Sequence, residues 1–150
     1  MRLSVEATKL AHIIRLSRFD MPVDAELCEY LEDGAIGTVG TDIFVGFMPA
    51  GVNGIVLTTY PGGAPEQTCG SNGWTIEVPR LQLRVRWSDD ATAISKANAC
   101  AARLSAIANQ TIEGVYYRGV MLLQTPGLLY RDADNLANYG FNLEAEKAPS

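Results

Sequence analysis

Hydrophobic and polar residues alternate most regularly over residues 79–87. The apolar positions are Leu81, Leu83, Val85 and Trp87, and the polar positions are Arg80, Gln82, Arg84 and Arg86. Successive side chains of a strand point to opposite faces, so the pattern predicts a strand with one buried face and three guanidinium groups on the other. At about 3.3 Å per residue, Arg80 and Arg86 lie about 20 Å apart. This span favours contact with a neighbouring subunit over a small pocket.

A helical period predicts a first helix over residues 22–33, ended by Gly34. Its apolar face holds Val23, Leu27, Tyr30 and Leu31, and its outer face holds Glu26, Glu29, Glu32 and Asp33. Such an acidic face is either solvated or a partner for the arginines of another copy. Residues 1–20 also predict an amphipathic helix, with basic residues off its apolar stripe. Three interpretations stay open for it: an arm docking on a neighbour, a packing helix, or an extension upstream of a start at Met21.

A second main helix is predicted from Asp90 to about Ala108. Ser88 and Asp89 precede it as capping residues, and acidic groups at this end favour the helix dipole. Its predicted buried stripe consists of Ile94, Ala97, Ala101, Leu104 and Ala108. Asn109 follows as a residue suited to a left-handed stop.

The remaining apolar segments predict further strands. Short β-branched runs indicate strands at Ile43–Val45 and Gly54–Tyr60. Residues 115–124 form another, with Tyr117, Met121 and Leu123 on a common face. Residues 136–145 form the last, with Tyr139, Phe141 and Leu143 facing in and Asn138, Asn142 and Glu144 facing out.

These elements predict an α+β fold. We expect a mixed, mostly antiparallel sheet of about four to five strands, packed by two main helices, plus an N-terminal helix. A single domain would span residues 21–146, preceded by the helical extension 1–20 and followed by a frayed tail at 147–150.

Residues 60–73 are rich in Pro and Gly and predict a loop of about a dozen residues, a length that is often functional. Gly62 and Gly63 do not indicate a phosphate site, because no G-K-[ST] follows them.

Composition narrows the function. A net charge of −5 disfavours sequence-independent binding to nucleic acid, which depends on phosphate neutralisation. Three widely spaced cysteines argue against a disulfide framework or a structural zinc site and fit a reducing compartment. Cys28 and Cys100 are expected in the core, and Cys69 is expected to be exposed. We find no signal peptide and no run long enough to span a membrane.

Candidate catalytic chemistry is sparse. His12 lacks the second histidine of an H-E-x-x-H site, and Asp132 and Asp134 lack the glycine and final glutamate of a calcium loop. No nucleophile elbow or dinucleotide-binding turn occurs. We therefore expect no enzyme, no cofactor and no metal.

Several segments in order resemble the tail terminator proteins of tailed bacteriophages, also called minor capsid or neck proteins. The resemblance covers residues 24–146. Its segments are GTVGTDIFVGFMP (37–49), IVLTTYPGGAPE (55–66), VPRLQLRVRW (78–87), QTPGLLYRDADN (124–135) and YGFNLEAE (139–146). Residues 1–20 match nothing in the family. Relatives often have a more glycine-rich turn near residues 131–135.

The resemblance implies a ring, typically a homohexamer, that caps the tail tube, stops its polymerisation and joins the tail to the head-completion proteins. Its partners would be other copies, the tail tube protein and a stopper or other neck protein. Genome DNA would pass through the lumen without specific binding. The protein would reside in the virion after assembly in the bacterial host cytoplasm.

Two surfaces are candidates for these contacts. Ring closure joins two different patches of neighbouring copies, so Arg80, Arg84 and Arg86 could meet Glu29 and Glu32 of the next copy. The alternative is that the arginines are solvated or pair within their own chain. The loop residues Tyr60, Pro61, Gly62, Gly63, Ala64, Pro65 and Glu66 are the candidate contact with the tube or neck. Other open functions are a stopper or tail tube subunit and, from a different class, a small-ligand binding domain or an enzyme with an intersubunit site.

Overall fold

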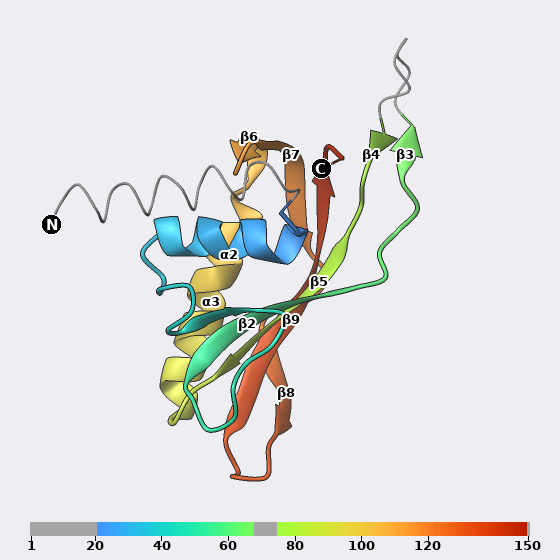
Figure 1. The fold of residues 1–150 in the computed structure, drawn as a ribbon. Helices are drawn as coiled ribbons and strands as arrows, with labels where there is room; N and C mark the ends of the chain where they lie inside the picture. The colour runs from blue at the N-terminus through green and yellow to red at the C-terminus, as the bar shows by residue number, and fades with distance from the viewer. Residues whose placement is uncertain (1–20, 68–74, 150) are drawn as a thin grey trace, which may run out of the picture.

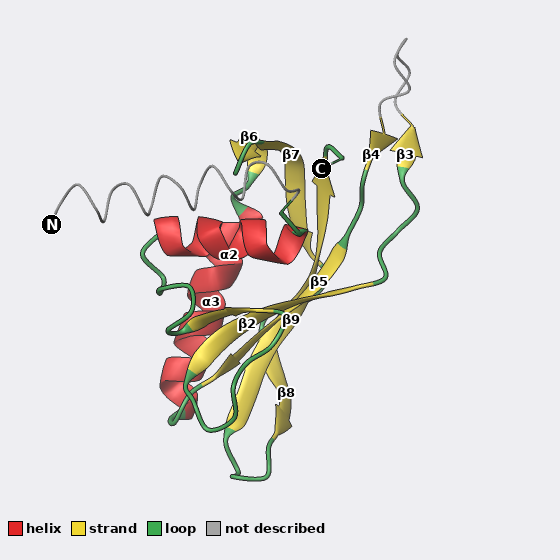
Figure 2. Cartoon of the chain, viewed as in Figure 1, coloured by secondary structure: helices red, strands yellow, loops and turns green. Residues whose placement is uncertain are grey.

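The computed structural model describes residues 21–67 and 75–149. The predictions for residues 1–20, which include His12, and for Cys69 lie outside the described residues. Two helices lie on one side of a curled sheet (Figures 1 and 2). They are α2 (Val23–Asp33) and α3 (Asp90–Ser105). The carboxylate of Asp89 caps α3 by accepting a hydrogen bond from the Thr92 N–H at 2.8 Å.

The main sheet has the strand order β1-β2-β5-β9-β7-β6, and β8 also pairs with β9. The strands are β1 (Ile43–Val45), β2 (Gly54–Tyr60), β5 (Arg80–Arg86), β6 (Ala108–Ile112), β7 (Val115–Leu122), β8 (Gly127–Arg131) and β9 (Ala137–Lys147). Only β1 and β2 are parallel among these pairs. The predicted mixed, mostly antiparallel α+β fold is confirmed, although the sheet has seven strands.

The core lies between the helices and the inner face of this sheet. Leu81, Leu83 and Val85 of β5 are fully buried against it, as the alternation predicted. Further core residues are Leu27, Cys28 and Leu31 from α2, Ala97, Cys100 and Leu104 from α3, and Phe141 and Leu143 from β9. The outer face of the sheet, which carries Arg80, Arg84 and Arg86, has no helix over it in the described part of the chain (Figure 2).

The end of α3 differs from the prediction. The helix ends at Ser105, and Ala108 is an exposed residue of β6. Ile94 is half-buried, and Ala93 and Cys100 belong to the buried stripe instead. Buried Ile107 anchors the chain as it leaves the helix. Asn109 has the predicted left-handed conformation, with φ at 47°, but it lies within β6 and does not end the helix.

The common face predicted for Tyr117, Met121 and Leu123 of β7 is also wrong. Tyr117 is buried, but Met121 and Leu123 are exposed, and Val120 is buried instead. The register between β7 and β9 shifts between Tyr117 and Gly119. This bulge reverses the alternation along the rest of the strand, because one extra residue moves every later side chain to the other face.

Strands β7 and β8 are two parts of one interrupted strand along β9. Leu122 pairs with Leu143 and Gly127 pairs with Gly140, so residues 123–126 stand opposite residues 141–142. The Gly127–Arg131 strand was predicted as part of a connection, since Pro126 and the polar residues before it obscure the pattern.

The C-terminal strand continues further than predicted. β9 includes Lys147, and Lys147 and Ala148 are buried, which corrects the frayed tail placed at these residues. Two backbone hydrogen bonds hold this end of the strand. The Glu77 N–H donates to the Lys147 carbonyl at 2.8 Å, and the Lys147 N–H donates to the Glu77 carbonyl at 3.0 Å. Asn138, predicted to face solvent, is also buried.

Candidate functional site

The three arginines of β5 all have partners within their own chain. Arg80 Nε lies 2.9 Å from Glu144 Oε2, and both side chains keep some exposure. Arg84 donates to Asn138 Oδ1 at 2.8 Å, and its guanidinium lies 5.9 Å from the centre of the Tyr130 ring. These contacts arrange Arg80 and Arg84 along the outer face of the sheet.

Arg86 has the most complete set of partners. Its guanidinium donates to the carbonyl oxygens of Val52, at 2.8 and 3.0 Å, and Pro49, at 3.0 Å. It also lies 3.7 Å from the carboxylate of Asp132, and only 11% of its side chain is exposed. Arg86 therefore fixes the loop after β1 to the outer face of the sheet, and little of it is left for a neighbour.

The acidic candidates lie on α2. A carboxylate oxygen of Glu32 accepts a hydrogen bond from the Val39 N–H at 2.6 Å, while Glu29 is half-buried. With one chain described, a contact between these acids and the arginines of another copy stays a prediction.

The predicted loop at residues 60–73 is partly a β-arm, which we define as residues 61–67 and 75–79. Its strands β3 (Glu66–Gln67) and β4 (Thr75–Ile76) pair antiparallel and continue the β2–β5 ribbon beyond the sheet (Figure 1). This strand pair was not predicted because three prolines lie close to it, and proline indicates a loop or the edge of a sheet. They are Pro61, Pro65 and Pro79.

The base of the β-arm is anchored to the body. Ile76 is buried, the Glu77 N–H donates to the Lys147 carbonyl of β9 at 2.8 Å, and Glu66 lies 2.9 Å from Arg118 of β7. Pro61 to Glu66 are exposed. The candidate contact residues are thus presented on a ribbon whose direction is set by the body.

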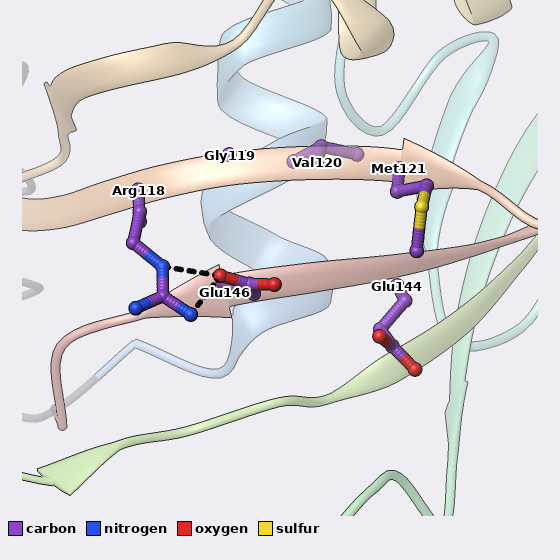
Figure 3. Close-up of a pocket in the computed structure, with 6 residues that line it drawn as sticks. All are labelled: Arg118, Gly119, Val120, Met121, Glu144 and Glu146. Atoms are coloured by element: carbon purple, nitrogen blue, oxygen red, sulfur yellow. Dashed lines mark hydrogen bonds and ion pairs between the residues drawn. The ribbon is translucent and has the colours of Figure 1, made fainter. Parts of the chain in front are cut away.

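A hollow of about 160 Å³ lies on the outer face of β7 and β9, and Figure 3 shows the residues that line it. Its lining residues are Arg118, Gly119, Val120, Met121, Glu144 and Glu146. Arg118 turns toward Glu146 and pairs with it, which neutralises part of the wall. The lining residues of this hollow include no histidine, cysteine or hydroxyl side chain in the described part of the chain.

The candidate metal and thiol chemistry finds no support among the described residues. Asp132 Oδ1 accepts hydrogen bonds from the backbone N–H groups of Asp134 and Leu136, both at 3.0 Å. The side chain of Asp132 therefore shapes a turn. Residues 21–67 and 75–149 contain no group of three potential metal ligands. Cys28 and Cys100 are buried as predicted, and burial raises the pKa of each thiol to about 12.

A buried polar cluster was missed entirely. Lys147 Nζ of β9 donates to Glu26 Oε1 of α2 at 2.7 Å, and the Tyr117 hydroxyl donates to the same oxygen at 3.4 Å. Burial raises the pKa of Glu26, and it also raises that of Tyr117. The alternation of β9 could have indicated this position, because Leu143, Ala145 and Lys147 share one face. The predicted strand ended at Ala145, two residues before this lysine, and lysine is rarely buried without a partner.

No helix in the described part of the chain is long and apolar enough to span a membrane. The fold is similar to that of a chain in the virion of a native gene transfer agent particle. The two share 14% sequence identity with a TM-score of 0.57, and the match covers 85% of this chain and 95% of the other. No curated protein matches the sequence at a significant level.

The family model of the bacteriophage tail terminator protein matches residues 30–148. This match covers the end of α2 from Tyr30 onward, all of α3 and every described strand of the sheet. It agrees with the resemblance of residues 24–146 and with the similar fold in a virion. The chain belongs to the bacteriophage tail terminator family and is a structural protein of the tail.

Proposed function

We propose that the protein forms a ring, a homohexamer, which caps the tail tube, ends its polymerisation and joins the tail to the neck proteins. The observation that carries this proposal is the family match over residues 30–148. The anchored β-arm supports it, because an extended ribbon can order against a partner on docking. The ring's partners would be the tail tube protein and a stopper or other neck protein, met during assembly in the bacterial host cytoplasm.

The lumen of this ring would admit DNA without holding it. Residues 21–67 and 75–149 contain eight basic and fifteen acidic side chains. A body with this surplus of negative charge repels phosphate, which suits passage without specific binding.

The first experiment combines light-scattering mass with negative-stain microscopy of the protein alone and mixed with tail tubes. We expect rings, or added density only at tube ends. Self-polymerisation into tubes would instead identify a tube subunit. A monomer that ignores tube ends would overturn the terminator function and direct attention to a stopper.

The β-arm provides a specific test of tube binding. A side chain at Gly62 would overlap the backbone carbonyl of Val78, so Gly62→Val should distort the base of the arm while leaving the sheet folded. We expect tube binding to weaken by more than about tenfold, equivalent to about 1.4 kcal/mol. Co-sedimentation with tubes measures the loss, and circular dichroism checks the fold.

Gly63→Ala is the matched control for the arm. Its added Cβ would lie 3.5 Å from a methyl carbon of Val78, an ordinary contact. This variant should bind tubes like the unaltered chain. If Gly62→Val also binds normally while its arm is distorted, the arm does not contact the tube.

The arginine face, which we define as the outer face of β5 with Arg80, Arg84 and Arg86, remains a second proposed contact. Arg80 and Arg84 would make this contact. If Arg84 meets acids such as Glu29 and Glu32 of a neighbour, Arg84→Glu should weaken ring formation by about tenfold or more, because a lost interfacial charge pair costs about 2 kcal/mol. Light scattering over a concentration series measures this. Gln82→Glu, on the same face, is the control for added charge alone. Equal assembly of both variants would exclude the Arg84 contact.

A further inference from the structure

The two longest runs without a charged residue in this acidic chain are residues 43–65 and 119–130. The first begins with β1 and the second ends in β8. Both carry exposed apolar side chains, namely Val45, Phe47, Met121, Leu123, Leu128 and Tyr130. Phe47 is 73% exposed and Leu128 is 53% exposed. Exposed apolar groups gathered in this way indicate contact surfaces.

The two runs lie at opposite edges of the sheet and at the same position along the direction of the strands. One row of paired residues crosses the sheet through Phe44, Val56, Arg84, Gly140 and Gly127. This row spans four strand spacings, about 19 Å, from β1 to β8. In the described residues β8 pairs only with β9, so its other edge offers unpaired backbone groups beside Leu128 and Tyr130. Such an edge is suited to contact with another chain.

The charges beside the two runs have opposite signs. Asp42 precedes the first run, and Arg131 follows the second. Arg131 pairs with Asp90 at 3.0 Å, but the two side chains are 44% and 51% exposed. An ion pair this exposed contributes little and can be exchanged for another carboxylate at small cost.

We infer that the β1 edge of one copy, led by Phe47, packs against the β8 edge of the next copy around Leu128 and Tyr130, with Asp42 facing Arg131. The partner is a second copy of this chain, so the inference rests on the proposed ring. Two different patches meet, which is the heterologous contact that rings need. Because one row of paired residues links both edges, each added copy is displaced mainly sideways, and the series closes into a ring where the rotation between copies completes a full turn.

Cysteine cross-linking tests this contact on the full chain, free and bound to tail tubes. The double variant Phe47→Cys with Leu128→Cys is treated with a short bis-maleimide, beside each single variant and the parent chain. All of them carry Cys69→Ser, because Cys69 is expected to be exposed. We expect a ladder of covalent oligomers up to the ring for the double variant. The single variants should give no ladder.

Microscopy of the same samples separates the two possible failures. Rings or tube caps without a ladder beyond the single variants would overturn the edge contact and leave the proposed function standing. Absence of both rings and caps would overturn the proposed function, and the edge contact with it.

Mixing two blocked variants tests whether the contact is heterologous. Phe47→Glu blocks contact at the β1 edge, and Leu128→Glu blocks contact at the β8 edge. Neither variant should therefore form rings alone. Mixed in equal amounts, they should form one-to-one dimers by light-scattering mass, because one intact edge of each kind remains. Ala102→Glu adds the same charge at an exposed position of α3 and should assemble normally. Normal ring formation by either edge variant alone would contradict the contact.

Discussion

Replacing Lys147 with Met should lower the free energy of unfolding at pH 7 by about 3 to 5 kcal/mol, the cost of removing one partner of a buried ion pair. The side chains of Lys147 and Glu26 are 2% and 0% exposed, and their charged atoms lie 2.7 Å apart. The substitution leaves the carboxylate of Glu26 buried beside Tyr117, with one oxygen that already has no hydrogen-bond partner among the described residues.

The loss should depend on pH in a defined direction. Burial raises the pKa of Glu26 above its ordinary value of 4.5, although the hydrogen bond from Lys147 acts to lower it. Without Lys147 the folded-state pKa rises further above the unfolded value. Below about pH 4.5 the carboxyl is protonated in both states, so the variant regains stability relative to its value at pH 7. As pH rises toward the folded-state pKa, that stability is lost.

Urea denaturation at pH 7 and near pH 4 measures both effects. The control is the double variant Glu26→Gln with Lys147→Met, which removes both charges and keeps an acceptor for the Tyr117 hydroxyl. It should recover most of the loss, since a neutral buried pair carries no large desolvation cost. A loss that is the same at both pH values and in the double variant would show that packing, and not charge, sets the role of Lys147.

The parts of the fold that follow a local period were predictable from sequence. The strand around Leu83 alternates without interruption, and α2 has both its apolar face and its terminating Gly34. The parts that were missed depend on distant neighbours. The bulge before Gly119 is required by pairing with β9, and no residue near it in sequence signals the reversal of the later side chains.

The candidate site shows the same division. The arginine face was located correctly from Arg80, Arg84 and Arg86, because alternation fixes which side chains share a face. Their partners could not be predicted, since Asn138 and the Val52 carbonyl come from segments 54 and 34 residues away. Proline also concealed the β-arm, whose pairing depends on the continuation of two strands whose residues are far apart in the chain.

Burial of Arg86 changes what the arginine face can do. A strand with three guanidinium groups suggested one long charged surface, but Arg86 binds backbone carbonyls and holds the loop after β1 in place. That loop includes the exposed Phe47. Arg86 would thus act on assembly indirectly, by fixing the backbone next to the proposed contact edge.

Replacing Gly140 with Ala should cost about 3 kcal/mol or more in the free energy of unfolding. A Cβ atom at this position would overlap the backbone carbonyl of Leu83 in the adjacent strand β5. Overpacking usually costs about 1 to 3 kcal/mol when side chains can move aside, and here the obstructing atom belongs to the backbone of a central strand. Relief would require β5 and β9 to separate in the middle of the sheet.

Gly127→Ala is a closely matched control, because Gly127 pairs with Gly140 in the register of β8 and β9. Its added Cβ would have no atom within 4 Å, so its effect should stay within about 0.5 kcal/mol. Thermal and urea unfolding of both variants test the difference. Equal stability would show that β5 and β9 can separate at little cost. A large loss confined to Gly140→Ala would show that close approach of these strands holds the row from β1 to β8 on which the proposed ring contact depends.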